Sequence, residues 1–224
     1  MNSKSRTTAE VTPSSLAALL KRSKGEHLKG LTRLKVVYRP HICPFHELLE
    51  LIPEKSRVFD LGCGAGTFLH LVAELRNPAA LGGIEISEEL VQSTEGMLSD
   101  CHCDLRTSVY DGQNIPDWIA DYDIVTLIDV LHHVPPDQQM EFIRRIGEKM
   151  KTGAQLILKD INAESRVLVL FNKLHDFVVS REIGHELTAA AIGSQLEAAG
   201  FDVIKKSRCR MLVYPHVLFH CRKI

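Results

Sequence analysis

Downstream of Pro53, short apolar runs alternate with longer segments whose apolar residues recur at helical spacing. Strands are expected at 57–61, 80–86, 104–108, 123–129 and 154–160, and all of these segments except 104–108 are largely apolar. Between them, a helix is expected at 88–99 with Ser87 as its N-cap, and a second helix opens at Pro135. This alternation predicts an α/β fold, a doubly wound sheet with helices on both faces.

The two ends of this region carry further patterns. Apolar residues at helical spacing predict a helix over 42–52, before the first strand, and another over 187–199. After Gly200, strands are expected at 201–209 and 217–223, joined by a turn around Pro215. The last part of the sheet is therefore predicted to be a hairpin.

Residues 1–40 differ from the rest of the chain in charge. They hold nine lysines and arginines and only two glutamates, whereas the whole chain has a formal net charge of −1. We interpret this segment as a basic, partly disordered N-terminal arm, with a short amphipathic helix at 15–24, that serves as a lid or binds a membrane surface or an acidic carrier protein. A solvated tail is the alternative. Residues 41–224 are expected to form one domain.

Composition and cysteine usage narrow the class of protein. The chain is 45% hydrophobic and 25% charged, as in ordinary globular proteins, and it contains no apolar run near the ~20 residues of a membrane-spanning helix. With a polar N-terminus, we expect a cytoplasmic protein, and association with a membrane surface stays open. The six cysteines form no C-x-x-C pair, so no metal site is expected, and the cluster Cys101-His102-Cys103 is interpreted as a loop.

One segment carries a specific chemical signal. Asp60-Leu61-Gly62-Cys63-Gly64-Ala65-Gly66 follows the first predicted strand and precedes a predicted helix. Alternating glycines allow a tight turn and a close approach of the backbone to a ligand, and the helix directs its N-terminal dipole at the turn. The dinucleotide-binding pattern G-x-G-x-x-G would need a glycine at position 67, which is Thr67. The loop therefore predicts a nucleotide-like cofactor other than a nicotinamide.

The spacing G-x-G-x-G after Asp60 resembles motif I of the class I S-adenosylmethionine-dependent methyltransferases. The similarity continues in the family's order through Leu81–Ser87, Val109–Gly112, Asp121–Val134 and Met150–Leu158. It implies a seven-stranded, mostly parallel sheet with an antiparallel last strand. It also implies S-adenosylmethionine as cofactor and S-adenosylhomocysteine as product.

Cofactor-binding residues are expected in five parts of the chain. The resemblance implies that Glu85 binds the ribose hydroxyls and that Asp111 lies beside the adenine. Arg39 precedes the first family-like helix, and we expect this segment to fold over the cofactor with Arg39 near the methionyl carboxylate. The full set is Arg39, Asp60, Gly62, Cys63, Gly64, Gly66, Glu85, Ile86, Asp111, Gly112, Ile128 and Asp129.

Two histidines just after the fourth predicted strand are candidates for acid–base chemistry. His132 and His133 fall at the carboxyl end of that strand, where open α/β sheets place their ligands. Histidine is the side chain best suited to remove a proton near neutral pH. We predict that His132 faces the cleft as catalytic base and that His133 contacts the substrate.

An insertion at 162–186 separates the fifth strand from the next helix. Its apolar run from Val167 to Val179 would be buried or would cover something apolar. In the resembling family such insertions shape the acceptor pocket. Phe171, Asn172, Asp176 and His185 are therefore predicted to bind substrate, and His175 is a second catalytic candidate.

Taken together, these patterns predict a methyltransferase that acts on a small, rather apolar acceptor. O-methylation of a lipid-, quinone- or polyketide-like molecule, free or bound to a carrier, is favoured over attack at nitrogen or carbon. A non-enzymatic S-adenosylmethionine-binding regulatory module and a nucleic-acid methyltransferase are the alternatives. The turn after the fourth strand lacks the Asn/Asp-Pro-Pro-aromatic signature of amino-methylating nucleic-acid enzymes, so a nucleic-acid partner is not expected.

Overall fold

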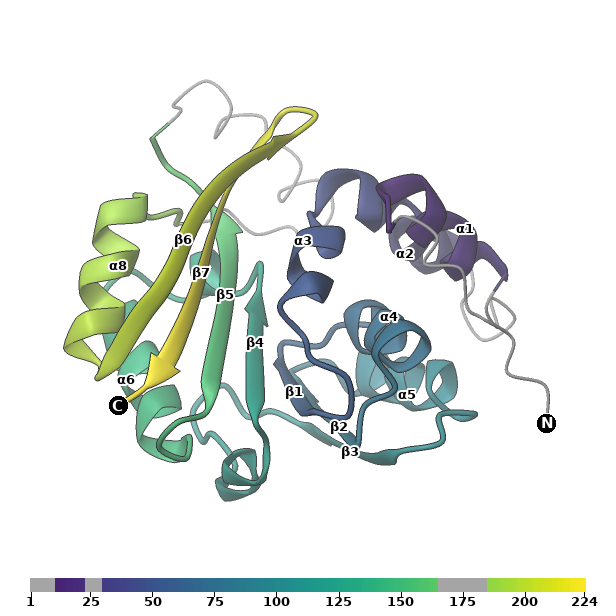
Figure 1. Cartoon of the computed structure of the whole chain (residues 1–224), viewed down its shortest axis with the longest axis horizontal. Coiled ribbons are helices and arrows are strands. Elements are labelled where there is room, and N and C mark those ends of the chain that lie inside the picture. The colour runs from purple at the N-terminus through teal and green to yellow at the C-terminus, as the bar shows by residue number, and fades with distance from the viewer. Residues whose placement is uncertain (1–10, 23–29, 165–184) are drawn as a thin grey trace.

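The computed structural model describes residues 11–22, 30–164 and 185–224. Its seven strands form one sheet in the order β3-β2-β1-β4-β5-β7-β6 (Figure 1). The strands are β1 (Arg57–Leu61), β2 (Ala80–Glu85), β3 (Asp104–Val109), β4 (Ile124–Ile128), β5 (Gln155–Ile161), β6 (Phe201–Met211) and β7 (Tyr214–Lys223). The described helices are α1 (Pro13–Arg22), α2 (Gly30–Ile42), α3 (Phe45–Glu50), α4 (Thr67–Arg76), α5 (Glu88–Met97), α6 (Gln139–Lys149) and α8 (Ala189–Ala198), with short 3₁₀ helices at Asp117–Asp121 and Leu131–His133.

The strand directions confirm the predicted fold class. Strands β3, β2, β1, β4 and β5 pair in parallel, and β7 pairs antiparallel with both β5 and β6. The predicted turn of the last hairpin was misplaced, because Pro215 pairs with Arg210 inside the ladder and Met211 pairs with Tyr214. The turn consists of Leu212 and Val213. The order in which the chain adds strands reverses between β1 and β4, because β2 and β3 follow on one side and β5 on the other. Folds of this kind bind their ligands at this switch point.

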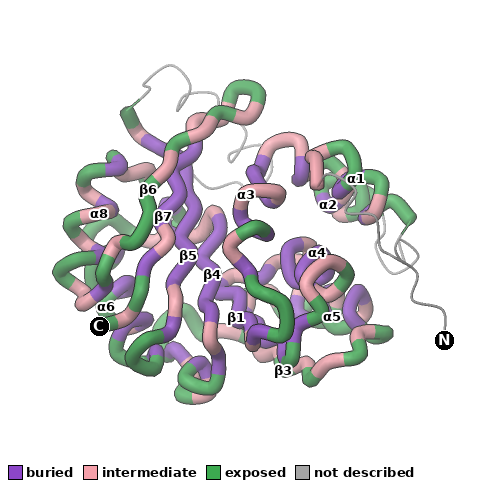
Figure 2. Tube along the Cα trace, in the orientation of Figure 1, coloured by how far each residue is buried: buried purple, intermediate pink, exposed green. Residues whose placement is uncertain are grey.

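Two hydrophobic cores lie on opposite faces of the sheet. Side chains of successive strand residues point to opposite faces, so Val58 packs on one core while Phe59 packs on the other. One core joins the sheet to α6 and α8, and the other joins it to α1, α3, α4 and α5. Figure 2 shows the resulting buried centre, with the central strands enclosed between exposed helix surfaces. Burial on both faces explains why these strands are continuous apolar runs.

The N-terminal helices are part of this core. Leu16 and Leu20 of α1 and Val36 of α2 are buried, at 2%, 4% and 5% exposure, in the core that also contains α3 and α4. The predicted domain boundary after residue 40 falls inside α2, which continues to Ile42. Residues 11–22 and 30–42 are therefore not a solvated arm, because their apolar side chains pack against the core that contains α3 and α4.

Candidate active site

A pocket of about 610 Å³ opens at the carboxyl ends of β1, β2 and β4, with α2 on one wall and α6 on another. This volume suits a nucleoside-sized ligand together with part of a second molecule. Most of the residues predicted to bind the cofactor line it, namely Arg39, Asp60, Gly62, Cys63, Gly64, Glu85, Ile86, Gly112, Ile128 and Asp129. The structure therefore brings together segments from five separate parts of the chain.

The glycine loop has the geometry that its spacing predicts. Gly62, Gly64 and Gly66 have φ of 77°, 56° and 77°, a region that L side chains rarely adopt. A Cβ on Gly62 would lie 2.5 Å from Cγ2 of Val130, so this glycine lets the loops after β1 and β4 touch. A Cβ on Gly64 would meet no protein atom within 4 Å, and Gly64 lines the pocket. The space in front of Gly64 is thus available to a ligand. Gly66 does not line the pocket; it precedes α4 as its N-cap and packs against Thr94.

Glu85 ties the second strand to the glycine loop. Its Oε2 accepts a hydrogen bond from the Gly64 N–H at 3.0 Å, and its Oε1 accepts from the Ser87 N–H at 3.2 Å. Each carboxylate oxygen keeps a second lone pair, so the pair of hydroxyls of a ribose can still donate to it. Ser87 in turn caps α5, as predicted, by accepting from the Leu90 N–H at 3.3 Å.

Asp60 is a buried carboxyl at the base of the loop. The Thr126 hydroxyl donates to its Oδ1 at 2.5 Å. Burial raises the pKa of Asp60 to about 7, against the opposing effects of the Thr126 hydrogen bond and the charge of Arg39. A cationic ligand group placed near Asp60 would favour its ionised form.

Asp129 is held by two cations. Its Oδ2 accepts from Nη2 of Arg39 at 2.8 Å, and its Oδ1 contacts Nζ of Lys159. Burial alone would raise the pKa of Asp129, but Lys159 and Arg39 outweigh it and hold the pKa well below its usual range. Asp129 also has φ of 56°, an uncommon conformation that marks functional loops. This carboxylate is therefore fixed, charged and directed at the pocket.

Sequence reasoning missed Lys159. The residue lies in the apolar run of β5 and is fully buried, with 0% exposure. A lysine inside a strand that is buried on both faces needs a carboxylate partner, because an unpaired buried charge is very costly. That rule was the available signal, and it points to Asp129 on the neighbouring strand's end.

His133 lies where its predicted contact with the substrate would place it, whereas His132 does not have its predicted orientation. His133 lines the pocket and is exposed, whereas His132 is only 4% exposed and is absent from the pocket wall. Nδ1 of His132 lies 2.5 Å from Oδ1 of Asp160, and the His132 N–H donates to Oδ2 of the same carboxylate at 3.2 Å. The two imidazole rings touch, with centroids 4.1 Å apart. The prediction that His132 faces the cleft was wrong, because Asp160 draws its ring into the protein.

Other predicted residues fall elsewhere. Asp111 is exposed, and its Oδ1 accepts from the N–H groups of Gln113 and Asn114 at 2.8 and 2.7 Å, so it shapes a turn beside the pocket while Gly112 lines the wall. His185 is exposed and does not line the pocket, but its N–H donates to the His132 carbonyl at 2.7 Å. The candidates Phe171, Asn172, His175 and Asp176 lie outside the described residues.

Within the described residues, one group of side chains could hold a metal ion. Oxygen or nitrogen atoms of Asp129, His132 and Asp160 lie within 4.8 Å of one another. The ammonium of Lys159 already contacts Asp129 there, so a divalent ion would have to displace a buried lysine. The donor set therefore fits a buried ion-pair network better than a metal site.

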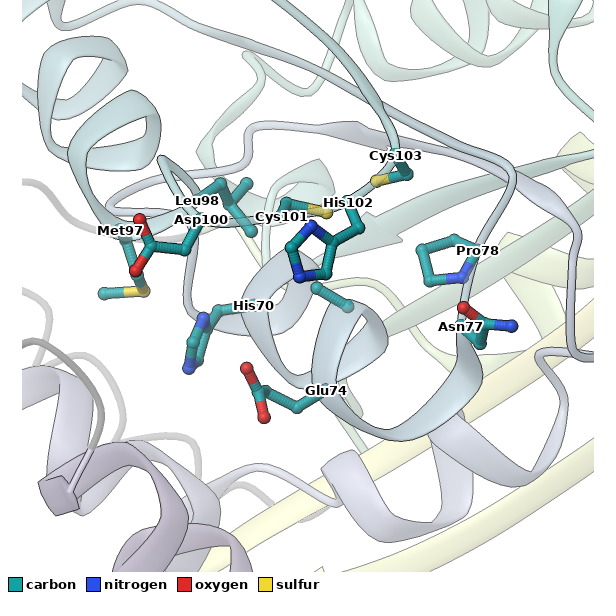
Figure 3. Close-up of a pocket in the computed structure, with 11 residues that line it drawn as sticks. His70, Glu74, Asn77, Pro78, Met97, Leu98, Asp100, Cys101, His102 and Cys103 are labelled. Atoms are coloured by element: carbon teal, nitrogen blue, oxygen red, sulfur yellow. The ribbon is translucent and has the colours of Figure 1, made fainter. Parts of the chain in front are cut away.

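A second, smaller pocket of about 210 Å³ is lined by residues of α4 and of the segments that lead into β2 and β3 (Figure 3). Cys101, His102 and Cys103 line it together with His70 and Glu74. Burial raises the pKa of the Cys103 thiol to about 12, so this thiol stays protonated at neutral pH and is a weak ligand and nucleophile. This pocket has no feature that connects it to the chemistry of the first.

The sequence model of a family described as a methyltransferase domain matches residues 38–206. The chain belongs to this family, the S-adenosylmethionine-dependent methyltransferases of class I, whose cofactor is S-adenosylmethionine. The pocket at the switch point and the glycine loop agree with this assignment.

Among curated relatives, the chain is 29% identical over 131 residues to carboxy-S-adenosyl-L-methionine synthase of Campylobacter fetus, covering 54% of this chain and 53% of that protein. It is 27% identical over 107 residues to ubiquinone biosynthesis O-methyltransferase of Coxiella burnetii, covering 48% and 44%. The chain thus matches about half of the length of these relatives.

Solved structures agree in fold. A methyltransferase from Haloferax volcanii, solved in complex with the Trm112 activator, superposes with a TM-score of 0.70 at 15% identity over 93% of this chain and 97% of that one. Magnesium protoporphyrin IX methyltransferase from Synechocystis, solved with S-adenosylhomocysteine, gives 0.66 at 17% identity over 94% and 96%. At these identities the likeness concerns the fold alone.

Proposed function

We propose that this enzyme transfers a methyl group from S-adenosylmethionine to an oxygen of a small, rather apolar acceptor of the lipid, quinone or polyketide type. The observation that carries the proposal is one continuous pocket that contains both the glycine loop and His133. Val134 and Phe142 add apolar surface beside that histidine. A base next to apolar wall surface suits the deprotonation of a hydroxyl on an apolar molecule.

The residues of the pocket fit the cofactor. Gly64 leaves its space open, Glu85 offers lone pairs to a pair of hydroxyls, and Asp60 offers a carboxylate to an ammonium group. When bound, S-adenosylmethionine supplies an activated methyl group on a sulfonium. The protein contributes binding and orientation, so that the acceptor oxygen can approach in line.

We assign proton removal to His133, because it is the histidine that reaches the pocket. His132 and Asp160 act as positioning residues: their short hydrogen bond fixes one ring, and that ring contacts His133. The carboxylate of Asp160 also stabilises positive charge that develops on this pair of rings. His132 thereby keeps a role in catalysis, although an indirect one.

The acceptor class gains support from one relative. The Coxiella burnetii protein is named as an O-methyltransferase of ubiquinone biosynthesis, which is consistent with a quinone-like acceptor and with attack by oxygen. A carrier-bound acceptor would suit the basic residues at 1–40, and a cytoplasmic location with contact to a membrane surface would suit a lipid-like acceptor. No helix among the described residues is long and apolar enough to cross a membrane.

Calorimetry with S-adenosylhomocysteine and NAD tests the cofactor site. S-adenosylhomocysteine should bind and NAD should not, and Glu85→Ala should weaken binding by about 1–3 kcal/mol, the value of a lost charge-assisted hydrogen-bond pair. A screen of hydroxylated quinone precursors and hydroxylated aromatic acids, read by mass spectrometry, tests the acceptor. An acceptor heavier by one methyl group supports the proposal. A carboxylated cofactor, as the name of the Campylobacter fetus relative would suggest, or methylation of nitrogen only would contradict it.

A further inference from the structure

The tip of the β6–β7 hairpin has a composition that packing does not explain. Its two turn residues, Leu212 and Val213, are 62% and 39% exposed. Leu212 also has φ of 55°, at the first position of a two-residue turn, which normally takes glycine. A leucine here is both strained and exposed, and an observed outlier of this kind points to a function. Figure 1 shows the tip extending past the end of β5.

Basic side chains accompany this apolar tip. Arg208 and Arg210 lie two residues apart on β6, so both project from the same side of the strand, and both are exposed. Arg208 pairs with Glu164 at 2.6 and 2.8 Å, whereas Arg210 has no ion-pair partner among the described residues. The tip therefore combines two exposed aliphatic side chains with a nearby arginine, Arg210, whose charge is available to an anionic partner.

The hairpin contacts α2, the helix that forms one wall of the pocket. Nε2 of His216, at the start of β7, lies 2.8 Å from the carbonyl of Ile42, the last residue of α2. The outer face of α2 carries Leu34 and Tyr38, one helical turn apart and 65% and 49% exposed. Lys35 and Arg39, each one residue further along α2 and therefore about 100° round the helix, line the pocket. Exposed apolar residues thus occur on both elements, which are joined through His216 and Ile42.

We propose that the hairpin tip, together with the outer face of α2, docks on an anionic lipid surface. Aliphatic and aromatic residues that enter the interface, flanked by arginines that meet acidic headgroups, are the features such a surface recognises. A protein partner would need about 800 Å² of continuous contact on this chain, which isolated residues on two elements do not provide. The inference rests on the proposed function in one respect, because it gives an apolar acceptor a route from the lipid to the pocket.

Flotation with vesicles tests the surface. The full-length protein should bind vesicles of phosphatidylcholine mixed with phosphatidylglycerol and should bind phosphatidylcholine vesicles much less. Leu212→Ser with Val213→Ser should weaken binding to the mixed vesicles at least about tenfold. The matched control is Ile224→Ser, which removes an apolar side chain of 70% exposure at the other end of the same hairpin and should change nothing.

A second variant separates function from folding. Leu212→Gly should raise Tm, because glycine adopts φ of 55° without strain, and it should still weaken vesicle binding. Equal binding by all variants would overturn the proposal, and so would a loss of self-association in place of a loss of lipid binding. S-adenosylhomocysteine binding, measured on the same samples, keeps the two proposals apart. If S-adenosylhomocysteine binds normally but vesicles are not bound, only the proposal of a docking surface is wrong. If vesicles are bound but apolar acceptors are not methylated, only the proposed acceptor class is wrong.

Discussion

The loops after β1 and β4 lie side by side on the pocket wall and hold their shapes by different means. After β1, positive φ angles at Gly62, Gly64 and Gly66 set the path of the chain, and the Gly64 N–H donates to the carboxylate of Glu85. After β4, Asp129 takes a positive φ with a side chain, and buried charges on β5 and α2 hold it there. The first loop is local in its construction, whereas the second depends on residues from distant parts of the chain.

This difference separates a loop that neighbouring elements shape from one that depends on distant charges. The backbone of the glycine loop is hydrogen-bonded to Glu85 at the end of β2 and to Thr94 of α5. The loop after β4, at 129–133, forms the β4 side of the pocket. There Asp129 pairs with Arg39 and Lys159, and His132 is hydrogen-bonded to Asp160. Such a network has fixed geometry and charge, and a change in any one of its members should disturb the others.

The largest expected effect concerns His133. His133→Ala should lower turnover by about 10²–10⁴ while S-adenosylhomocysteine affinity stays within a few-fold, because the variant loses only the base. His132→Ala should lower turnover less and should flatten the pH profile, and His132→Asn, which can still donate to Asp160, should recover part of the loss. A larger loss in His132→Ala than in His133→Ala, with both proteins folded, would return the role of base to His132.

The next largest effect should come from the buried ion pair. Lys159→Met leaves Asp129 in the interior with Arg39 alone, so the free energy of unfolding should fall by about 3–5 kcal/mol. Lys151→Met is the matched control, because it breaks an exposed pair with Asp123 and should cost at most about 1 kcal/mol. Urea denaturation measures both. Equal losses would show that the β4 side does not depend on its buried charge.

A smaller effect isolates the glycine loop. Gly64→Ala and Gly153→Ala both place a methyl group at positive φ with no protein atom within 4 Å, so both should lose about 1–2 kcal/mol of stability. Only Gly64 lines the pocket, and only Gly64→Ala should weaken S-adenosylhomocysteine binding, by at least about tenfold in calorimetry. Unchanged affinity in Gly64→Ala would mean that the ligand does not approach this part of the backbone.

A further comparison concerns the pH dependence of stability near Asp129 and Lys159, whose charges act on His216. Burial, together with the charge of Lys159, lowers the pKa of His216 to about 3. Between this value and the unfolded pKa of 6.5 the unfolded chain binds more protons, so stability should fall as pH decreases from 6.5 toward 3, by at most about 1.4 kcal/mol per pH unit. His216→Gln should reduce that slope in urea titrations at several pH values. A wild-type slope in the variant would assign the acid sensitivity to other groups.

Much of the fold and of the cofactor site could be predicted from local patterns. The pattern of apolar residues located the strands, and glycines with acids at the strand ends located the ligand loops. Both signals depend on residues that are close together in the sequence. The N-terminal segment was harder. Its basic residues suggested a solvated arm, but Leu16 and Leu20 pack into a core whose other members lie far along the chain.

The sequence by itself determined the α/β sheet and the loop that approaches the cofactor, since period, glycine spacing and strand-end acids act over a few residues. The class of enzyme followed from the resemblance to a known family. Only the tertiary structure decided which histidine reaches the pocket. His132 and His133 are adjacent and chemically identical, and the choice between them depends on Asp160, a residue of another strand. It also decided the role of Lys159, because a charge can be buried only where the fold brings a partner to it.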